Sequence, residues 1–217
     1  MPGSVLSVNV GAPREIEWLD HRASTAIWKE PVTGRVALAG VNLAGDNQAD
    51  RRFHGGPDKA VYAYGREDYD WWEEELGRGL APGTFGENLT VAGVDVTGAA
   101  VGERWSVGST VLEVAGPRIP CWKLGARMSD PAFPVTFAAA GRPGAYLRVV
   151  AEGELGAGDE IEVVRTPGRL LTVGRVASIY HLNRADAPEL LAVPELGVEW
   201  RAWAEERVGG AEHALPG

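Results

Sequence analysis

Cys121, the only cysteine of the chain, is the residue whose surroundings most strongly suggest chemistry. It lies in the sequence GPRIPCWKL, where Pro117 and Pro120 restrict the backbone that leads to it. Arg118 and Lys123 place positive charge close by, and nearby cations favour the thiolate, the form of cysteine that binds metals or attacks electrophiles. A lone cysteine can also be a small apolar core residue. The rigid, cationic surroundings favour a functional thiolate over that alternative.

A second candidate is a glycine pair with ionisable neighbours. Gly55 and Gly56 follow His54 and precede Asp58 and Lys59. Adjacent glycines let the backbone approach a ligand, and their N–H groups can bind an anion beside a lysine. The same residues can equally form a tight turn between two strands. The segment alone leaves both interpretations open.

Two further segments contain polar residues that could bind a ligand. Gly86, Glu87 and Asn88 stand between apolar residues and could bond a polar heterocycle, although a loop bonded to its own backbone is the simpler interpretation. Arg142 and Arg148 flank the start of an apolar stretch. Arginine binds phosphate through paired hydrogen bonds, or it can be an ordinary surface charge of a strand.

Composition narrows the classes of function. With 21 basic and 30 acidic residues, the net charge of −9 argues against binding to nucleic acid or to anionic lipid. One cysteine excludes an internal disulfide and a paired-cysteine zinc site. No apolar run reaches the length of a membrane span and no secretory signal is visible, so we expect a cytoplasmic protein. The sequence also lacks GxSxG, HExxH, phosphate-loop and GxGxxG patterns.

Short strands must position these residues, because turn sequences break up the first 165 residues. One helix is expected here, over Glu67–Leu76, with Tyr69 and Trp72 on its apolar face and Gly77 at its end. The Gly108-Ser109 pair predicts a two-residue hairpin turn. Strands are expected at 5–10, 25–29, 35–41, 105–107, 110–114, 145–150 and 161–164.

The pattern changes after a linker at 165–168. Thr172 can cap a helix that ends near Leu182, and two more helices are expected at 187–191 and 198–207. Trp200 and Trp203, three residues apart, are expected to pack rather than to react. The expected fold is mainly β (α+β), with a body at 1–165 and a three-helix appendage at 166–217.

Taken in order, these segments resemble the MOSC domain, named after the C-terminal domain of molybdenum cofactor sulfurases, and within it the small YiiM-like proteins. The likeness runs from VLSVNVG at the N-terminus through TAIWK, GD, HGGPDKAVY, FGENL, PRIPCWKL and GAYLR, and it includes the helical tail. No single segment is decisive, but the ordered set is specific. One departure is Gly116, where we expect a polar residue.

The resemblance implies a barrel-like β core and a bound molybdenum cofactor, the molybdopterin complex of the metal, with no role for pyridoxal phosphate. It implies that Cys121 is the protein ligand of molybdenum and the catalytic residue. A soft thiolate suits such a metal, and one cysteine suffices when the cofactor supplies further sulfurs. The implied cofactor-binding residues are His54, Gly55, Gly56, Asp58, Lys59, Gly86, Glu87, Asn88, Arg118, Lys123 and Arg148.

The activity that the resemblance implies is reduction of N-hydroxylated compounds such as hydroxylaminopurines, hydroxamates and amidoximes. Because the sequence has no flavin, haem or iron–sulfur signature, electrons must come from a separate reductase, and a homodimer is compatible with the sequence. Two alternatives stay open. Cys121 could carry a persulfide as a sulfurtransferase, since an electropositive thiolate suits that chemistry too. The protein could also store or deliver the cofactor without turnover.

Overall fold

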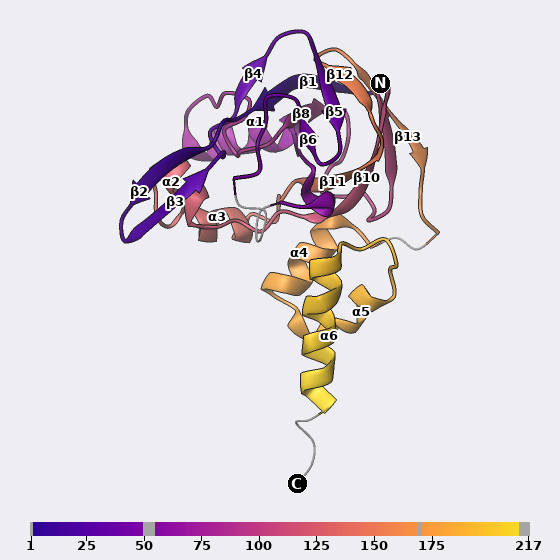
Figure 1. Ribbon diagram of the computed structural model, residues 1–217. Coiled ribbons are helices and arrows are strands. Elements are labelled where there is room, and N and C mark those ends of the chain that lie inside the picture. Colours follow the sequence, from indigo (N-terminus) through magenta and orange to yellow (C-terminus); the bar gives the residue numbers. More distant parts are fainter. Residues whose placement is uncertain (1, 50–54, 169–170, 213–217) are drawn as a thin grey trace.

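A closed β-barrel forms the body of the protein in the computed structural model, which describes residues 2–49, 55–168 and 171–212 (Figure 1). Within these ranges seven strands close the barrel in the order β13-β9-β10-β11-β7-β8-β1, with β4 beside β1. Their bounds are β1 Gly3–Val10, β4 Glu30–Val32, β7 Val61–Gly65, β8 Leu89–Ala92, β9 Arg104–Val107, β10 Thr110–Pro117, β11 Ala145–Ala151 and β13 Glu160–Arg165. The mainly β fold expected from the sequence is confirmed.

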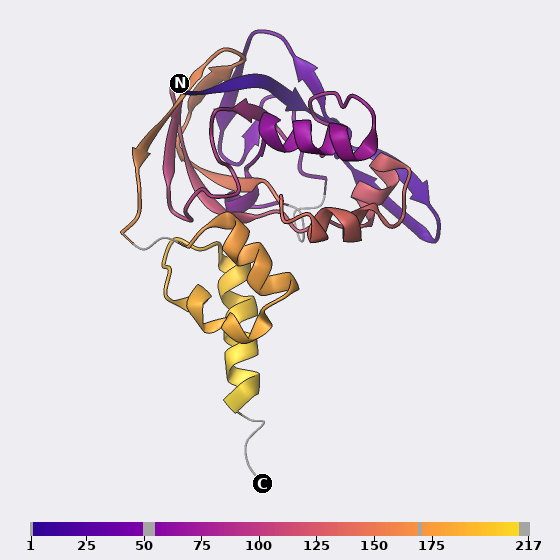
Figure 2. The ribbon, with the colours of Figure 1, turned by 180° about the vertical axis from the view of Figure 1, so that it is seen from behind.

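The barrel closes because alternate side chains of its strands fill its interior. On β9, Trp105 and Val107 are buried and alternate with half-buried neighbours. Neighbouring strands are antiparallel except β7 and β8, which are parallel. A parallel pair needs a crossover, and helix α1 (Arg66–Leu76) provides it along the outside of the barrel (Figure 2). Covered on both faces, β7 is buried at every position.

Smaller elements surround the barrel. The strands β5 (Arg35–Ala39), β6 (Asn42–Leu43) and β12 (Gly153–Gly156) form a separate sheet. A hairpin of β2 (Arg14–Trp18) and β3 (His21–Thr25) projects from the body (Figure 1). The prediction of a strand at 25–29 was therefore wrong by several residues. After Thr25 the chain turns, with the Lys29 N–H bonded to the Ile27 carbonyl, and leaves the sheet.

Several expected elements are confirmed. Helix α1 begins and ends within one residue of its predicted bounds, buries Tyr69 and Trp72, and is stopped by Gly77 with a φ of 63°. The β9–β10 hairpin has its turn at Gly108, whose φ of 59° is the conformation expected of the first turn residue. The periodicity of α1 and the Gly-Ser pair were therefore reliable signals.

Two further helices show that the expectation of a single helix within 1–165 was wrong. They are α2 (Trp122–Met128) and α3 (Phe133–Ala139), which follow β10 and pack against each other. Each has only seven residues, too few to show a helical period in the sequence. Both contribute to an aromatic cluster between the helices and the barrel, with Tyr64, Trp72, Phe85, Leu124 and Phe137 fully buried.

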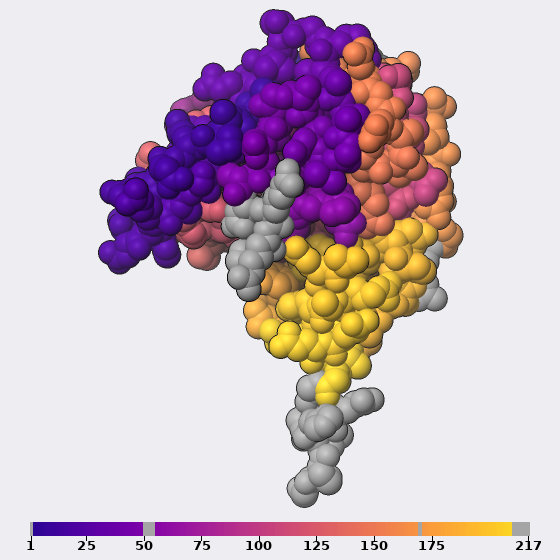
Figure 3. Space-filling model, viewed as in Figure 1, coloured from indigo at the N-terminus to yellow at the C-terminus, as the bar shows by residue number. Residues whose placement is uncertain are grey.

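The C-terminal residues form a helical lobe below the barrel, consisting of α4 (Val173–His181), α5 (Pro188–Leu191) and α6 (Val198–Glu212) (Figure 3). Thr172 caps α4 as expected, its Oγ1 accepting the Arg175 N–H at 3.1 Å. Short 3-10 turns lie at η1 (Pro57–Lys59) and η2 (Arg184–Asp186). The lobe has its own core around Val176, Ile179 and Leu190. Each helix in the described part of the chain is too short or too polar to span a lipid bilayer.

Candidate functional site

Cys121 lies where β10 ends and α2 begins. Its backbone is extended, with φ −133° and ψ 175°, and its carbonyl accepts the Leu124 N–H at 2.9 Å in the first turn of α2. The side chain is half-buried and makes no capping hydrogen bond. The thiol borders two cavities, a polar one inside the body and an aromatic one toward the helical lobe.

The polar cavity has a cationic lining. Arg118, Lys123 and Lys29 are all buried, at 5%, 7% and 8% exposure, and each borders the cavity together with Cys121. The cavity holds about 100 Å³, room for an anionic group rather than for a large molecule. Burying cations beside a cavity costs free energy unless a negative group balances their charge. Lys29 is already paired with Asp46, so the preference for an anionic ligand comes from Arg118.

The surroundings of the Arg118 guanidinium explain this preference for an anion. Its guanidinium lies over the rings of Tyr62 and Phe137, with Cζ 5.5 and 5.6 Å from the ring centroids. Its Nη1 is buried and has no hydrogen-bond partner. An arginine stays protonated in a protein, so this nitrogen is a charged donor kept away from solvent. A ligand oxygen in the cavity would satisfy it.

A hydrogen-bond network around Asp46 fixes the opposite wall. The Asp46 carboxylate pairs with the Lys29 ammonium and accepts the Gly11 N–H and the Asn88 Nδ2, each at 2.8 Å. The Asn88 Oδ1 in turn accepts the Tyr62 N–H at 3.1 Å. Burial lowers the pKa of Lys29, an effect that the Asp46 charge opposes. Asn88 thus lines the cavity, and the polar atoms of its side chain make hydrogen bonds that fix the cavity wall.

The glycine pair occupies a different place from the one expected. Gly55 and Gly56 border a small cavity beside Trp200, not the polar one. The Gly56 N–H, one of the groups that could bind an anion, donates here to Gln48 Oε1 at 2.8 Å. Gln48 Nε2 also donates to the Lys59 carbonyl at 3.0 Å, which fixes the turn. His54 lies outside the described residues.

Asp58 and Lys59 face the helical lobe. Asp58 Oδ2 accepts the Val198 N–H at 2.9 Å, which caps the start of α6, and the other Asp58 oxygen pairs with Arg148. Asp58 is therefore held as a structural contact and does not line the polar cavity. Lys59 lines both cavities, and its Nζ pairs with Glu199 on α6.

Glu87, predicted to bind the cofactor, does not line the polar cavity, and one of its two carboxylate oxygens is held by hydrogen bonds. Gly86 borders the cavity, but the Glu87 side chain is fully buried away from it. Its Oε1 accepts Tyr69 Oη and the Gly83 N–H at 2.6 Å and Thr90 Oγ1 at 2.8 Å. Burial raises the pKa of Glu87, against the effect of these hydrogen bonds. The carboxyl group stabilises the loop that carries Gly86.

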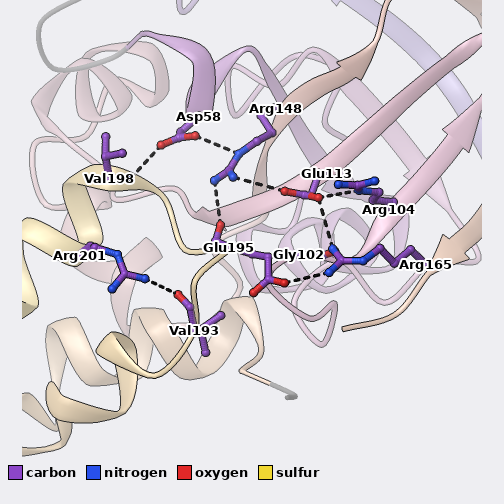
Figure 4. Close-up of polar contacts among 10 residues, drawn as sticks. All are labelled: Asp58, Gly102, Arg104, Glu113, Arg148, Arg165, Val193, Glu195, Val198 and Arg201. Atoms are coloured by element: carbon purple, nitrogen blue, oxygen red, sulfur yellow. Dashed lines mark hydrogen bonds and ion pairs between the residues drawn. The ribbon is translucent and has the colours of Figure 1, made fainter. Parts of the chain in front are cut away.

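Arg148, predicted to bind phosphate, lies instead in an ion-pair network between barrel and lobe (Figure 4). Its Nη1 lies 3.3 Å from Glu113 Oε1, and its Nη2 donates to the Glu195 carbonyl at 2.8 Å. Glu113, 5% exposed, also pairs with Arg104 at 2.6 Å and with Arg165 at 3.5 Å. These ion pairs balance the charge of Arg148, although its Nε has no hydrogen bond of its own, and they connect the two parts of the molecule.

The structure thus brings Cys121, Arg118, Lys123, Lys59, Gly86 and Asn88 to one cavity and places Gly55, Gly56, Asp58, Glu87 and Arg148 elsewhere. Sequence reasoning assigned no role to Lys29, Asp46 or Tyr146, which also line the cavity. Lys29 and Asp46 lie in the TAIWK and GD segments, which are part of the resemblance to the MOSC domain. That resemblance was the sequence signal that could have identified them. The glycine at 116 also has a reason, because a Cβ there would lie 2.7 Å from Nε1 of Trp200.

Comparison with known proteins identifies the family of this chain. The MOSC domain model matches residues 50–162. An uncharacterized protein, YflK, from Bacillus subtilis is 37% identical over 202 residues, covering 92% of this chain and 91% of its own length. A Gibberella moniliformis protein named Reductase is 31% identical over 172 residues, 76% of this chain but 30% of its own length.

A solved structure shows the same architecture over the whole body and lobe. YiiM from Geobacillus stearothermophilus superimposes with a TM-score of 0.80 at 30% identity, covering 95% of this chain and all of that one. The family model spans more than half of the chain, and it contains Cys121, Arg118 and the glycine pair. The chain belongs to the MOSC domain family, within its YiiM-like group.

Proposed function

We propose that this protein binds molybdenum cofactor with the terminal phosphate in the polar cavity and Cys121 as the protein ligand of the metal, and that it reduces N-hydroxylated compounds. The carrying observation is that the half-buried thiol and the buried Arg118 with its unpartnered Nη1 line one cavity. A thiolate suits molybdenum, and a buried guanidinium suits the terminal phosphate of the pterin.

The donor set of the cavity fits this cofactor. Arg118 supplies positive charge for a phosphate, beside Lys123 and the Lys29–Asp46 pair, and the roughly 100 Å³ of space matches a head group of that size. As the only cysteine, Cys121 would leave the metal's remaining ligands to the cofactor. When bound, the cofactor supplies a metal that changes oxidation state, and the protein's part is to bind and orient it.

The chain's own residues have defined tasks in this proposal. Cys121 presents its sulfur at the boundary of both cavities, so a metal held there is accessible from the helical lobe. Asn88 and Asp46 keep the cavity wall in place through their mutual hydrogen bond. Electrons come from a separate reductase, a proposal supported by a relative named Reductase whose similar region is only part of a larger protein.

The test is metal analysis of protein produced in a host that makes the cofactor, followed by reduction of benzhydroxamic acid with an artificial electron donor. We expect bound molybdenum and pterin, and loss of both in Cys121→Ser. A matched control is Ser129→Gly at the other end of α2, outside both cavities, which should keep its metal.

Three outcomes would overturn all or part of the proposal. Full activity in Cys121→Ser would remove the thiol from the mechanism. One stable added sulfur on Cys121 after treatment with a cysteine desulfurase, without pterin, would support the sulfurtransferase alternative instead. Molybdenum without turnover would leave the binding role and indicate storage or delivery.

A further inference from the structure

The aromatic cavity on the other side of Cys121 has no place in the proposed cofactor site. It holds about 430 Å³, within the roughly 300–1,000 Å³ typical of small-molecule sites. The segment Pro117–Cys121 and Tyr146 form its wall on the barrel, and helices α4 and α6 form the wall opposite. Lys59, Cys121 and Tyr146 line both cavities, so the thiol lies at their common boundary.

The wall from the helical lobe consists of three aromatic rings. Tyr180 on α4 meets Trp200 with ring centroids 5.4 Å apart at 89°, and Trp203 at 5.2 Å and 50°. Trp200 and Trp203 pack against the core of the lobe, as the sequence predicted, yet both also face the cavity. Ile119 adds an apolar surface opposite them.

This lining selects for the shape of a ligand. Protein interiors are normally filled, so an open space bounded by three large rings leaves apolar surface that a ligand could cover. Aromatic rings pair best with other planar rings, edge-to-face or in offset stacks. The Glu199 carboxylate, 55% exposed on the same wall and paired with Lys59 through Oε2, adds a further acceptor for a ring N–H or amino group.

We propose that this cavity binds the organic part of the substrate, and that the helical lobe thereby selects planar aromatic or heteroaromatic N-hydroxylated compounds over aliphatic ones. The inference rests on the proposed function, because it places the reducible N–O group at the Cys121 end of the cavity. It assigns to the lobe the specificity of the reaction, while the barrel holds the cofactor.

Binding to the cofactor-free protein tests the cavity separately from the chemistry. Benzhydroxamic acid and acetohydroxamic acid carry the same reactive group and differ in the ring, and calorimetric titration compares their affinities. We expect the aromatic probe to bind at least about tenfold more tightly, and Trp203→Ala to weaken it by about tenfold, through lost ring contact and buried area.

Variants that preserve the fold keep this test decisive. Trp203→Leu retains an apolar side chain of the lobe core and should show the same loss in a protein whose circular dichroism is unchanged. Glu206→Ala, exposed on the same helix and outside the cavity, should bind like the parent protein. In the cofactor-loaded enzyme, Trp203→Leu should lower kcat/KM for benzhydroxamate and leave that for acetohydroxamate unchanged.

The outcomes separate the two proposals. Equal affinity for both probes, or no change in folded Trp203→Leu, would overturn the substrate cavity even if the protein contains molybdenum and reduces hydroxamates. Selective aromatic binding in a protein that never acquires molybdenum would support the cavity and contradict the proposed function.

Discussion

Two cationic regions of this molecule contain similar side chains but differ in how their charge is balanced. Around the polar cavity, Arg118 is buried with a nitrogen that has no partner. At the junction of barrel and lobe, Arg104, Arg148 and Arg165 converge on Glu113 (Figure 4). An arginine whose charge is balanced within the protein stabilises structure, whereas one left unsatisfied beside a cavity favours an anionic ligand.

The largest expected effect comes from breaking the balanced region at its centre. Glu113→Ala removes the buried carboxylate that pairs with three guanidinium groups, and it should lower the free energy of unfolding by about 3 kcal/mol, because partly buried cations lose their partner. Urea denaturation measures this. Glu162→Ala, exposed on β13, is the control and should stay within about 0.5 kcal/mol of the parent. A loss under about 1 kcal/mol for Glu113→Ala would mean that the network contributes little.

Exchanging one arginine in each region should give opposite results. Arg118→Met removes an unsatisfied buried charge, so stability should hold or rise, while affinity for inorganic phosphate and for the cofactor falls about tenfold to a hundredfold with the lost charged hydrogen bond. Arg148→Met should instead lose about 2 kcal/mol of stability and keep its molybdenum. Thermal shift with phosphate and metal analysis measure both. If the two variants changed stability and ligand affinity in the same way, the proposed difference between the two regions would be contradicted.

The sequence predicted best what depends on neighbouring residues. The β9–β10 hairpin follows from a Gly-Ser turn, the capped α4 from Thr172, and α1 from three apolar positions on one face. The proximity of Cys121 and Arg118 is of the same kind, since only two residues separate them in the chain. Helices α2 and α3 were not predicted because seven residues are too few to show a helical period. Helix α3 also has a proline in its first turn.

The predicted site residues that lie outside the polar cavity have partners far away in the chain. Asp58 caps a helix that begins 140 residues later, and Glu87 is bound to Tyr69, 18 residues earlier. Nothing local to an acidic residue shows whether a distant donor satisfies it. The Lys29–Asp46 pair is likewise set by the fold, which brings two chain segments to one wall. Only the closed barrel and the docked lobe decide which polar groups remain for a ligand.

The smallest expected effect concerns Lys59, which lines both cavities and pairs with Glu199 on the lobe. Because Glu199 is 55% exposed, Glu199→Gln should change stability by only about 0.5 kcal/mol. Removing this carboxylate makes the potential near the polar cavity more positive, so phosphate affinity at low salt should rise about twofold and the gain should vanish near 1 M salt, where the Debye length is about 3 Å. Calorimetric titration at both salt concentrations measures it, with Glu206→Gln on the same helix as control. Weaker phosphate binding at low salt would instead show that the ion pair positions Lys59 for the ligand. Lys59 would then serve both the polar cavity and the contact between barrel and lobe.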